Sequence, residues 1–277
     1  MLQTAARLVS GALGRDSAIV RSLRPMYESI LDLGYAGRGI PWVINGEEYR
    51  IDPHQRHRLG TDYDPPVAEF LRSHVRQGQT CFDIGANVGV YVLQLAHWTG
   101  PSGRVVAFEP NPSARTVLER HLRFNGITGR VTIVPAAVSR ESGTATMYVA
   151  DAEGMSRLDA PNEAIADRAQ AVEVPIISVD DYVQQSRVTP DVVMIDIEGF
   201  EIAALAGARR LIQDKRDLLI VAEMHPSVWS SAQTTRESAQ QLLDELQLTP
   251  VPLQGQSDAL ADHATVFLKQ RERKSAL

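Results

Sequence analysis

The 277-residue sequence contains a single cysteine, Cys81. One cysteine excludes a disulfide within the chain and leaves too few thiolates for a cysteine-rich zinc site. Cys81 lies in an apolar run, so we interpret it as a small core residue. A chain with so little cysteine suits a reducing compartment, and we expect a cytoplasmic protein.

Long apolar runs and excess positive charge are also missing. No segment approaches the roughly 20 consecutive apolar residues that span a bilayer, so we expect no transmembrane segment. The chain has 28 Lys and Arg against 34 Asp and Glu, a formal net charge of -6. This balance disfavours a polyanionic partner, and we do not expect nucleic acid binding.

The first 62 residues predict a cap ahead of the main domain, which we place at residues 63–277. Residues 1 to about 33 are typical of an amphipathic helix, and the stretch WVINGEEYRI alternates around Asn45-Gly46, a strong hairpin signal. We expect the apolar face of this helix to pack on the domain or on another subunit. A homodimer in which the caps are shared is therefore one alternative.

From residue 80 onward, strands and helices alternate, which predicts an α/β fold with a doubly wound, mostly parallel sheet. We expect strands in TCFDI, RVVAFEP, VTIVPAAV, VEVPIISV, DVVMIDIEG, LLIVAEMH and HATVFLKQ, a set of seven. Between them lie helices such as PSARTVLERHLRFNG and EIAALAGARRLI. The segment GTATMYVA predicts a short hairpin, and residues 151–171 a loop.

The turn DIGANVG follows the first of these strands, where doubly wound sheets bind their ligands. Glu109 ends the next strand, where an acid can accept hydrogen bonds from ribose hydroxyls. The glycines Gly85 and Gly89 are four apart, whereas the dinucleotide fingerprint has them five apart with a third between. This spacing disfavours an NAD-dependent oxidoreductase.

Asp83 at this turn would repel a pyrophosphate and attract a cation. S-adenosylmethionine carries a sulfonium, an α-amine and a ribose but no phosphate, so it is the ligand that the turn predicts. A noncatalytic nucleoside-binding module is the alternative, since it would use the same two carboxylates.

The ordered series FDIGANVG, VVAFEPNP, AAVS, MIDIEGFE and VAEMH resembles the FkbM family of S-adenosylmethionine-dependent methyltransferases. The resemblance covers roughly residues 63–269. It implies a class I, Rossmann-like methyltransferase fold and methylation of a hydroxyl group, often on a sugar or natural product. It also implies these cofactor-binding residues: Asp83, Gly85, Ala86, Asn87, Glu109, Asn111, Ala136 and Ala137.

Four polar residues near the ends of later strands are candidates for the chemistry. Asp196 and Glu198 are two apart, as are Glu223 and His225, so each pair shares a face of an extended chain. We predict His225 as the general base because its ordinary pKa is nearest neutrality, with Asp196 and Glu198 as further catalytic residues and Glu223 on the substrate side. Two carboxylates without a third ligand are a weak metal signal, so a divalent ion is an alternative that we do not expect.

Two further features concern the acceptor. The family commonly has a lysine two residues before the motif's aspartate, but this chain has Met194. This departure leaves the identity of the acceptor open. We also predict that Ser156 and Arg157 face the acceptor, since they lie where the family has a substrate-side segment; a solvated loop is the alternative.

Overall fold

The computed structural model describes residues 18–35, 37–56, 59–149, 157–158 and 169–271. The chain divides into two compact units between Tyr63 and Asp64. Within the described residues, no helix is long and apolar enough to cross a membrane.

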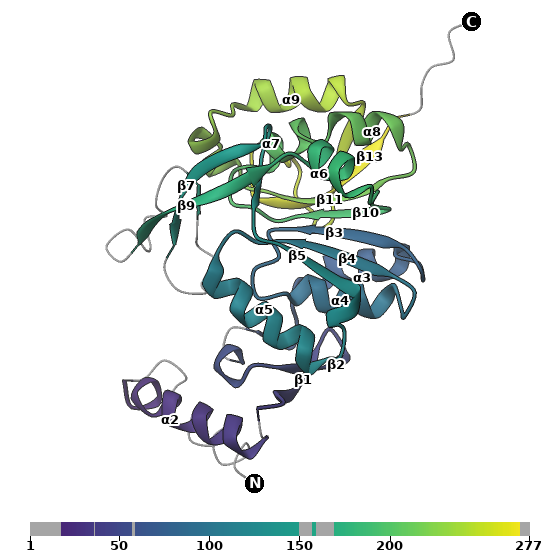
Figure 1. Cartoon of the computed structure of the whole chain (residues 1–277). Coiled ribbons are helices and arrows are strands. Elements are labelled where there is room, and N and C mark those ends of the chain that lie inside the picture. Colours follow the sequence, from purple (N-terminus) through teal and green to yellow (C-terminus); the bar gives the residue numbers. More distant parts are fainter. Residues whose placement is uncertain (1–17, 36, 57–58, 150–156, 159–168, 272–277) are drawn as a thin grey trace, which may run out of the picture. The chain divides into compact units, whose positions relative to one another are not determined.

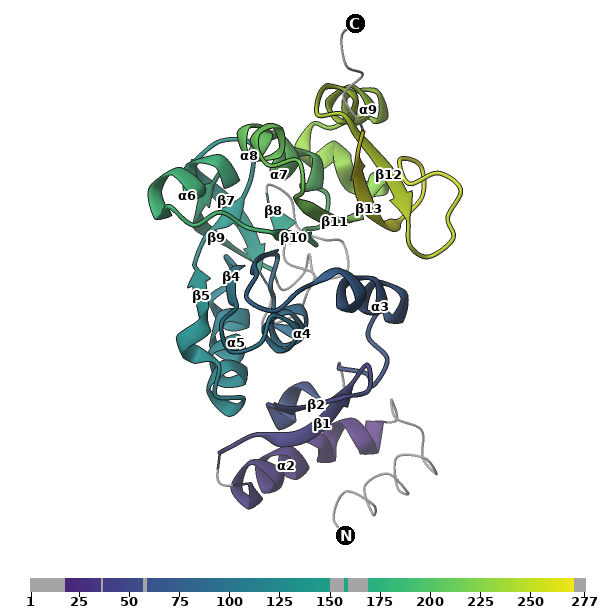
Figure 2. The same cartoon turned by 90° about the vertical axis from the view of Figure 1, so that its right-hand side faces the viewer.

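The described part of the first unit contains the later part of the expected helix and the expected hairpin, and residues 1–17 of the predicted helix lie outside the described residues. Helix α2 spans Ala18–Gly34, and strands β1 (Ile40–Ile44) and β2 (Glu47–Ile51) pair antiparallel (Figure 2). Asn45 and Gly46 both have positive φ, at 50° and 82°. Two such residues form the turn whose twist matches that of a two-residue hairpin, and the prediction is confirmed.

The second unit is built on a seven-stranded, mostly parallel sheet (Figure 1). The strand order is β12-β13-β11-β10-β3-β4-β5, and only β13 runs antiparallel to its neighbours. The predicted α/β, doubly wound methyltransferase fold is therefore confirmed. The strands are β3 (Thr80–Ile84), β4 (Arg104–Phe108), β5 (Val131–Val134), β10 (Val192–Ile195), β11 (Leu219–Met224), β12 (Leu248–Pro252) and β13 (Ala264–Gln270).

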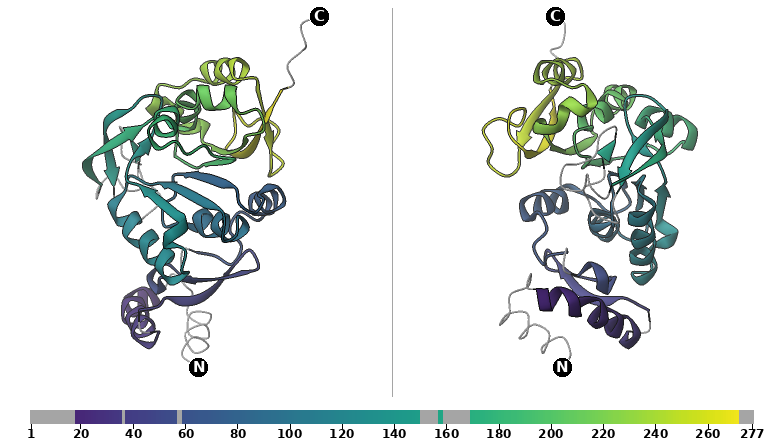
Figure 3. Two further views of the ribbon diagram at one scale, coloured as in Figure 1. Left: turned by 45° about the vertical axis from the view of Figure 1, so that its right-hand side comes forward. Right: turned by 90° about the vertical axis from the view of Figure 1, so that its left-hand side faces the viewer.

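Helices cover both faces of this sheet (Figures 1 and 3). One face lies against α6 (Val179–Ser186), α7 (Glu201–Ala206), α8 (Arg209–Asp214) and α9 (Arg236–Glu245), and their apolar residues share one core with alternate residues of the strands. Helices α3 (Pro65–His74), α4 (Val90–Trp98) and α5 (Pro112–Phe124) lie on the other side. Short helical turns η2 (Thr128–Arg130) and η4 (Pro226–Ala232) complete the unit, and η1 (Pro53–Gln55) belongs to the first unit.

The expected number of strands in the main sheet is correct, but one member differs. The stretch VEVPIISV lies in β9 (Gln170–Ile177), which belongs to a separate four-stranded sheet with β6 (Ala137–Val138), β7 (Gly143–Val149) and β8 (Arg157–Leu158). Its place in the main sheet is taken by β12, which contains Pro250 and Pro252. Proline lacks an N–H donor and is tolerated there because β12 is an edge strand, so its sequence gave only a weak strand signal.

Two other expectations differ in detail. The segment GTATMYVA does not fold into a hairpin of its own but forms the single strand β7, which pairs antiparallel with the next strand, β8, and along its whole length with β9. The predicted helix EIAALAGARRLI is divided into α7 and α8 at Gly207. A Cβ at Gly207 would lie 2.2 Å from the carbonyl oxygen of Ser139, so a side chain is excluded where the helix meets the chain after β6.

Candidate active site at the carboxyl ends of the strands

The DIGANVG turn joins β3 to α4 in a conformation that requires its glycines. Gly85 has φ +91°, and a Cβ there would lie 1.9 Å from the carbonyl oxygen of Asp196. Gly89 has φ +93°, and its Cβ would lie 2.4 Å from the side chain of Leu118 in α5. Gly85 therefore lets the turn pass against β10, whereas Gly89 serves helix packing.

Two buried carboxylates flank this turn. Asp83 is 1% exposed, and its Oδ2 atom has no hydrogen-bond partner in the structure. Glu109 is 5% exposed, and its two oxygens accept hydrogen bonds of 2.7 Å from the backbone N–H groups of Asn87 and Asn111. A buried carboxylate oxygen without a donor is costly, and it fits a site that a cationic or hydroxylated ligand completes.

Burial raises the pKa of Asp83 to about 8, with a further rise from the charges of Asp196 and Glu109. Burial also raises the pKa of Glu109 to about 7, against the lowering effect of the Asn111 and Asn87 amides. Both carboxyl groups therefore exchange protons near neutral pH when no ligand is present.

The strand register explains why distant polar residues meet. Asp83 is paired with Met194 on one side and Ala107 on the other, and Met194 is paired with Val221. Residues two apart on a strand share a face, so the face that carries these four positions continues to Glu109, Asp196 and Glu223 at the carboxyl ends. The opposite face carries the apolar core that packs on α6 to α9.

The second group of polar residues follows β10 and β11. The Nε2 atom of His225 lies 3.6 Å from Oε1 of Glu223, so these two side chains lie close together; their role in the chemistry stays a prediction. Burial and the charge of Glu223 raise the pKa of Asp196 to about 8. Burial likewise raises the pKa of Glu223, although the charge of His225 opposes the rise.

His225 is in an environment that favours its protonated form. Burial lowers the pKa of His225, but the hydrogen bond and charge of Glu201, with the charges of Asp196 and Glu223, outweigh it and raise the pKa to about 9. The imidazole of this ligand-free structure therefore holds a proton at neutral pH. The predicted role as a general base is favoured only as the pH rises.

Glu201 is a site residue that the sequence reasoning did not assign. It is fully buried at the start of α7 and accepts hydrogen bonds from Trp229 Nε1, at 2.8 Å, and from the Gly199 amide, at 2.9 Å. Its Oε1 atom also lies 2.6 Å from Nδ1 of His225. Glu201 belongs to the motif MIDIEGFE, but an acid in the first turn of a helix is already explained by a favourable helix-dipole interaction, so it was not chosen as a site residue.

His263 was missed as well. It directly precedes β13, and its Nε2 atom lies 2.6 Å from Oε1 of Glu223. The alternating pattern of HATVFLKQ predicts the strand correctly but does not say which neighbour it joins. Only the antiparallel position of β13 beside β11 brings His263 to the site.

The remaining predicted cofactor residues line the turn or support it. Ala86 donates its N–H to the Phe108 carbonyl, at 3.0 Å. The Asn111 side chain accepts from the Ser113 and Ala114 amides and so caps α5. Ala136 and Ala137 are both buried after β5, and Ala137 packs in the small core beneath the four-stranded sheet. A cofactor role for these residues stays a prediction.

The predicted acceptor-side residues are less well defined. Glu198 is partly exposed in the turn between β10 and α7. Ser156 lies outside the described residues, and only the backbone of Arg157, in β8, is described. Met194 is fully buried in the centre of β10, so the position of the family's lysine is filled here by an apolar side chain.

Comparison with known proteins identifies a family. Residues 83–250, more than half of the chain, match the family described as the Methyltransferase FkbM domain. The matched segment begins at Asp83 and contains all of the predicted site residues. His263 lies beyond it.

Three similar proteins are named for different methyl acceptors. The chain is 28% identical over 188 residues to the 31-O-demethyl-FK506 methyltransferase FkbM of Streptomyces tacrolimicus, a match covering 56% of this chain and 70% of that protein. It is 29% identical over 127 residues to a ribosomal protein L11 methyltransferase of Pelotomaculum thermopropionicum, covering 42% and 41%. It is 24% identical over 163 residues to the hexuronic acid methyltransferase AglP of Haloferax volcanii, covering 58% and 62%.

Proposed function

Since this chain belongs to the FkbM family of S-adenosylmethionine-dependent methyltransferases, we propose that it methylates a hydroxyl group of a small molecule, on a sugar or a glycosylated natural product. One observation carries the proposal. The unpartnered carboxylate oxygen of Asp83 and the polar group formed by Asp196, Glu223 and His225 lie on the same face of the sheet, at the carboxyl ends of neighbouring strands.

The residues of the turn fit the cofactor. Asp83 offers a buried anionic oxygen to the cationic part of the ligand, and Glu109 offers its remaining lone pairs to the ribose hydroxyls. We propose Gly85, Ala86 and Asn87 as the backbone that surrounds the ligand, with Asn111, Ala136 and Ala137 nearby. When bound, S-adenosylmethionine supplies a methyl group already activated on a sulfonium.

The protein must therefore align the acceptor oxygen, exclude water and take up a proton. During methyl transfer, a lone pair of the acceptor oxygen forms the new C–O bond, and the electron pair of the broken S–C bond stays on sulfur. The hydroxyl proton passes to the protein. We assign its uptake to the group of Asp196, Glu223 and His225, in which the neutral imidazole of His225 is the strongest base and becomes available above neutral pH.

The proposed hydroxyl acceptor has support from two relatives. One relative is named for a 31-O-demethyl substrate and another for a hexuronic acid. Acidic side chains beside the acceptor position suit an alcohol, which needs a proton acceptor. A third relative is named for ribosomal protein L11, so the test must distinguish a protein acceptor from a small-molecule acceptor.

The test begins with calorimetric titration of S-adenosylhomocysteine into the protein, with NAD as the control ligand. We expect binding of S-adenosylhomocysteine that is lost in Asp83→Ala and Glu109→Ala, and no binding of NAD. Labelled S-adenosylmethionine is then supplied with uronic acids, glycosides, a macrolide alcohol and purified ribosomal protein L11. Label in a hydroxylated small molecule supports the proposal. Label only in ribosomal protein L11 contradicts it, and so does cofactor binding without methyl transfer to any acceptor.

A further inference from the structure

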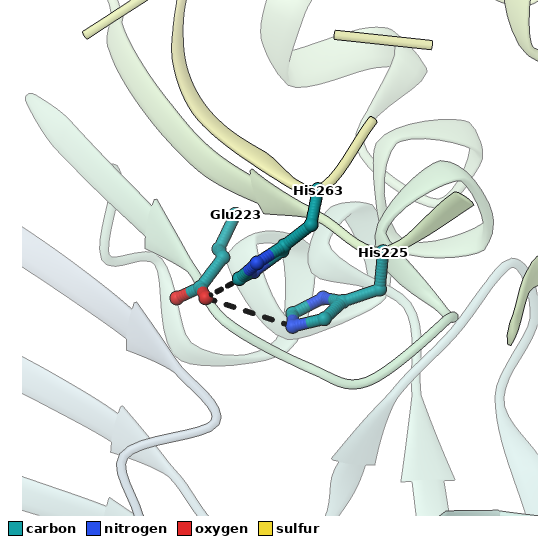
Figure 4. A group of neighbouring side chains, drawn as sticks. All are labelled: Glu223, His225 and His263. Carbon is teal, nitrogen blue, oxygen red and sulfur yellow. Dashed lines mark hydrogen bonds and ion pairs between the residues drawn. The ribbon is translucent and has the colours of Figure 1, made fainter. Parts of the chain in front are cut away.

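Three side chains at the adjacent ends of β11 and β13 form a compact cluster beside the proposed acceptor position (Figure 4). Oε1 of Glu223 lies 2.6 Å from Nε2 of His263 and 3.6 Å from Nε2 of His225. The two imidazole rings stack, with centroids 4.7 Å apart and planes inclined by 28°. One potential ligand atom from each residue lies within 4.8 Å of the other two. We call Glu223, His225 and His263 the Glu-His-His cluster.

The cluster follows from the strand register. Glu223 is paired with Thr265 across the antiparallel ladder of β11 and β13. Moving two residues along both strands leads to His225 and His263, on the same face as Glu223 and Thr265. The two histidines therefore meet because β13 runs antiparallel between β11 and β12, although 37 residues lie between them in the sequence.

Glu201 fixes which nitrogen of His225 faces the cluster. Its buried carboxylate is 2.6 Å from Nδ1, and the same carboxylate is held by the Trp229 indole and the Gly199 amide. Nδ1 is thereby engaged as the donor, and Nε2 is directed toward Glu223 and His263. A carboxylate behind a histidine is the usual arrangement around histidines that bind metals, because it sets the tautomer and the ring orientation.

The spacing of the cluster suits a metal ion. At Zn–N and Zn–O distances of roughly 2.0–2.1 Å, the ligand atoms of a tetrahedral site lie about 3.3 Å apart. The two Glu223 to histidine distances bracket this value, so small rotations of the exposed His263 side chain suffice. Two imidazole nitrogens and one carboxylate oxygen favour transition-metal ions over Mg²⁺ or Ca²⁺, which prefer oxygen ligands.

We propose that Glu223, His225 and His263 bind one divalent transition-metal ion, Zn²⁺ or a similar ion, with coordination positions left open toward the acceptor. The side chain of His263 is 60% exposed, so one side of the cluster is accessible to solvent. Three protein ligands with an open position are typical of catalytic rather than structural zinc sites.

The consequence for catalysis rests on the proposed function. A metal ion beside the acceptor lowers the pKa of a coordinated hydroxyl group. With the ion bound, His225 would be a ligand and no longer the proton acceptor, and the hydroxyl proton would pass to Asp196, a carboxylate of the site that lies outside the cluster. The acceptor oxygen forms the C–O bond while the S–C electron pair stays on sulfur.

Metal binding is tested on the full-length protein after treatment with a chelator and its removal. Zn²⁺ is titrated calorimetrically into wild type, His263→Ala, Glu223→Gln and the control His97→Ala, which alters an exposed histidine of α4. Co²⁺ is added to the same proteins, and its visible absorption reports nitrogen ligands in a site of low coordination number. Mg²⁺ at high excess serves as the competitor.

We expect one Zn²⁺ per chain, unaffected by Mg²⁺ and by His97→Ala, and at least tenfold weaker in His263→Ala and Glu223→Gln. Unchanged affinity in both cluster variants, or no binding to wild type, overturns the proposal. S-adenosylhomocysteine affinity is measured on every sample and shows that each variant is folded. Cofactor binding and methyl transfer without metal binding would leave the proposed function standing, whereas metal binding without methyl transfer would leave only the metal site.

Discussion

The Nδ1 atom of His225 lies 2.6 Å from the carboxylate of Glu201, a residue with no exposed surface. Glu201 comes from the start of α7 and His225 from the end of β11. The same carboxylate receives the indole N–H of Trp229 and the amide of Gly199, so three donors converge on one buried side chain. Glu201 therefore connects the folding of this region to the orientation of the candidate base.

Glu201→Ala should be strongly destabilising. It leaves the buried donors of Trp229 and Gly199 and the partly buried imidazole of His225 without an acceptor, and each such group costs about 1–3 kcal/mol. We expect a loss of at least 3 kcal/mol in the free energy of unfolding, measured by urea denaturation. Glu201→Gln keeps one carbonyl acceptor at the same place and should lose clearly less. Equal losses in the two variants would show that the hydrogen bonds of Glu201 are not what stabilises the region.

His225→Ala should lower turnover by about 100-fold or more and leave the affinity for S-adenosylhomocysteine near that of wild type. The reason is that His225 follows β11, whereas the proposed cofactor residues surround the turn after β3. Initial rates with labelled S-adenosylmethionine and calorimetry provide the two measurements, with His74→Ala of α3 as the control. Turnover equal to wild type would remove His225 from the chemistry.

Cofactor binding should depend on pH through Asp83 and Glu109. Their pKa values are raised to about 8 and about 7 in the ligand-free protein, and a cationic ligand favours the charged carboxylates. We expect the affinity for S-adenosylmethionine to rise as the pH increases from 6 to 9, with release of protons on binding. Calorimetry in two buffers of different ionisation enthalpy measures this release. Binding without proton exchange at pH 7 would contradict it.

Asp83→Asn should stabilise the ligand-free protein at pH 9 although it removes cofactor binding. A carboxyl group whose pKa is raised on folding contributes stability below its unfolded pKa, near 4, and that contribution is lost as the pH rises through about 8. Above pH 8 the folded protein therefore contains a charged, buried Asp83. We expect Tm to increase by roughly 2–4 °C, which corresponds to about 1 kcal/mol in a protein of this size. A decrease in Tm at pH 9 would show that Asp83 is satisfied by contacts within the protein.

Gly85→Ala should abolish cofactor binding and destabilise the fold, because its Cβ would lie 1.9 Å from the Asp196 carbonyl oxygen. Gly126→Ala is a matched control, since Gly126 also has positive φ, +67°, but nothing lies within 4 Å of the added Cβ. The control should lose only about 1 kcal/mol from backbone strain. Thermal unfolding and S-adenosylhomocysteine titration compare the two. Similar behaviour would mean that the turn can move away from β10.

Much of the fold was predictable because its signals are local. The Asn45-Gly46 hairpin, the DIGANVG turn and the central strands each carry their own pattern of glycine or apolar residues. Edge strand β12 was missed because its two prolines weaken any strand pattern, and β9 was placed in the wrong sheet because periodicity does not specify a partner.

In the candidate site, too, some residues have a local signal in the sequence and others are brought together only by the fold. Asp83 and Glu109 were predictable from a turn and a strand end, and Glu223 with His225 from their spacing. His263 and Glu201 were not, because their positions depend on an antiparallel ladder and on the burial of a helix start. Such contacts between distant segments arise from the three-dimensional packing of the whole sheet.

The position of β13 has a consequence for synthesis of the chain. Strand β13 lies between β11 and β12 but follows both in sequence, so during translation β11 has no partner on that side until β13 itself has been made. An unpaired edge of apolar residues invites pairing with other chains. A chain terminated before His263 would therefore aggregate through the open edge of β11, and it would also lack the histidine that completes the cluster. The segment that begins at His263 therefore completes both the sheet and the Glu-His-His cluster.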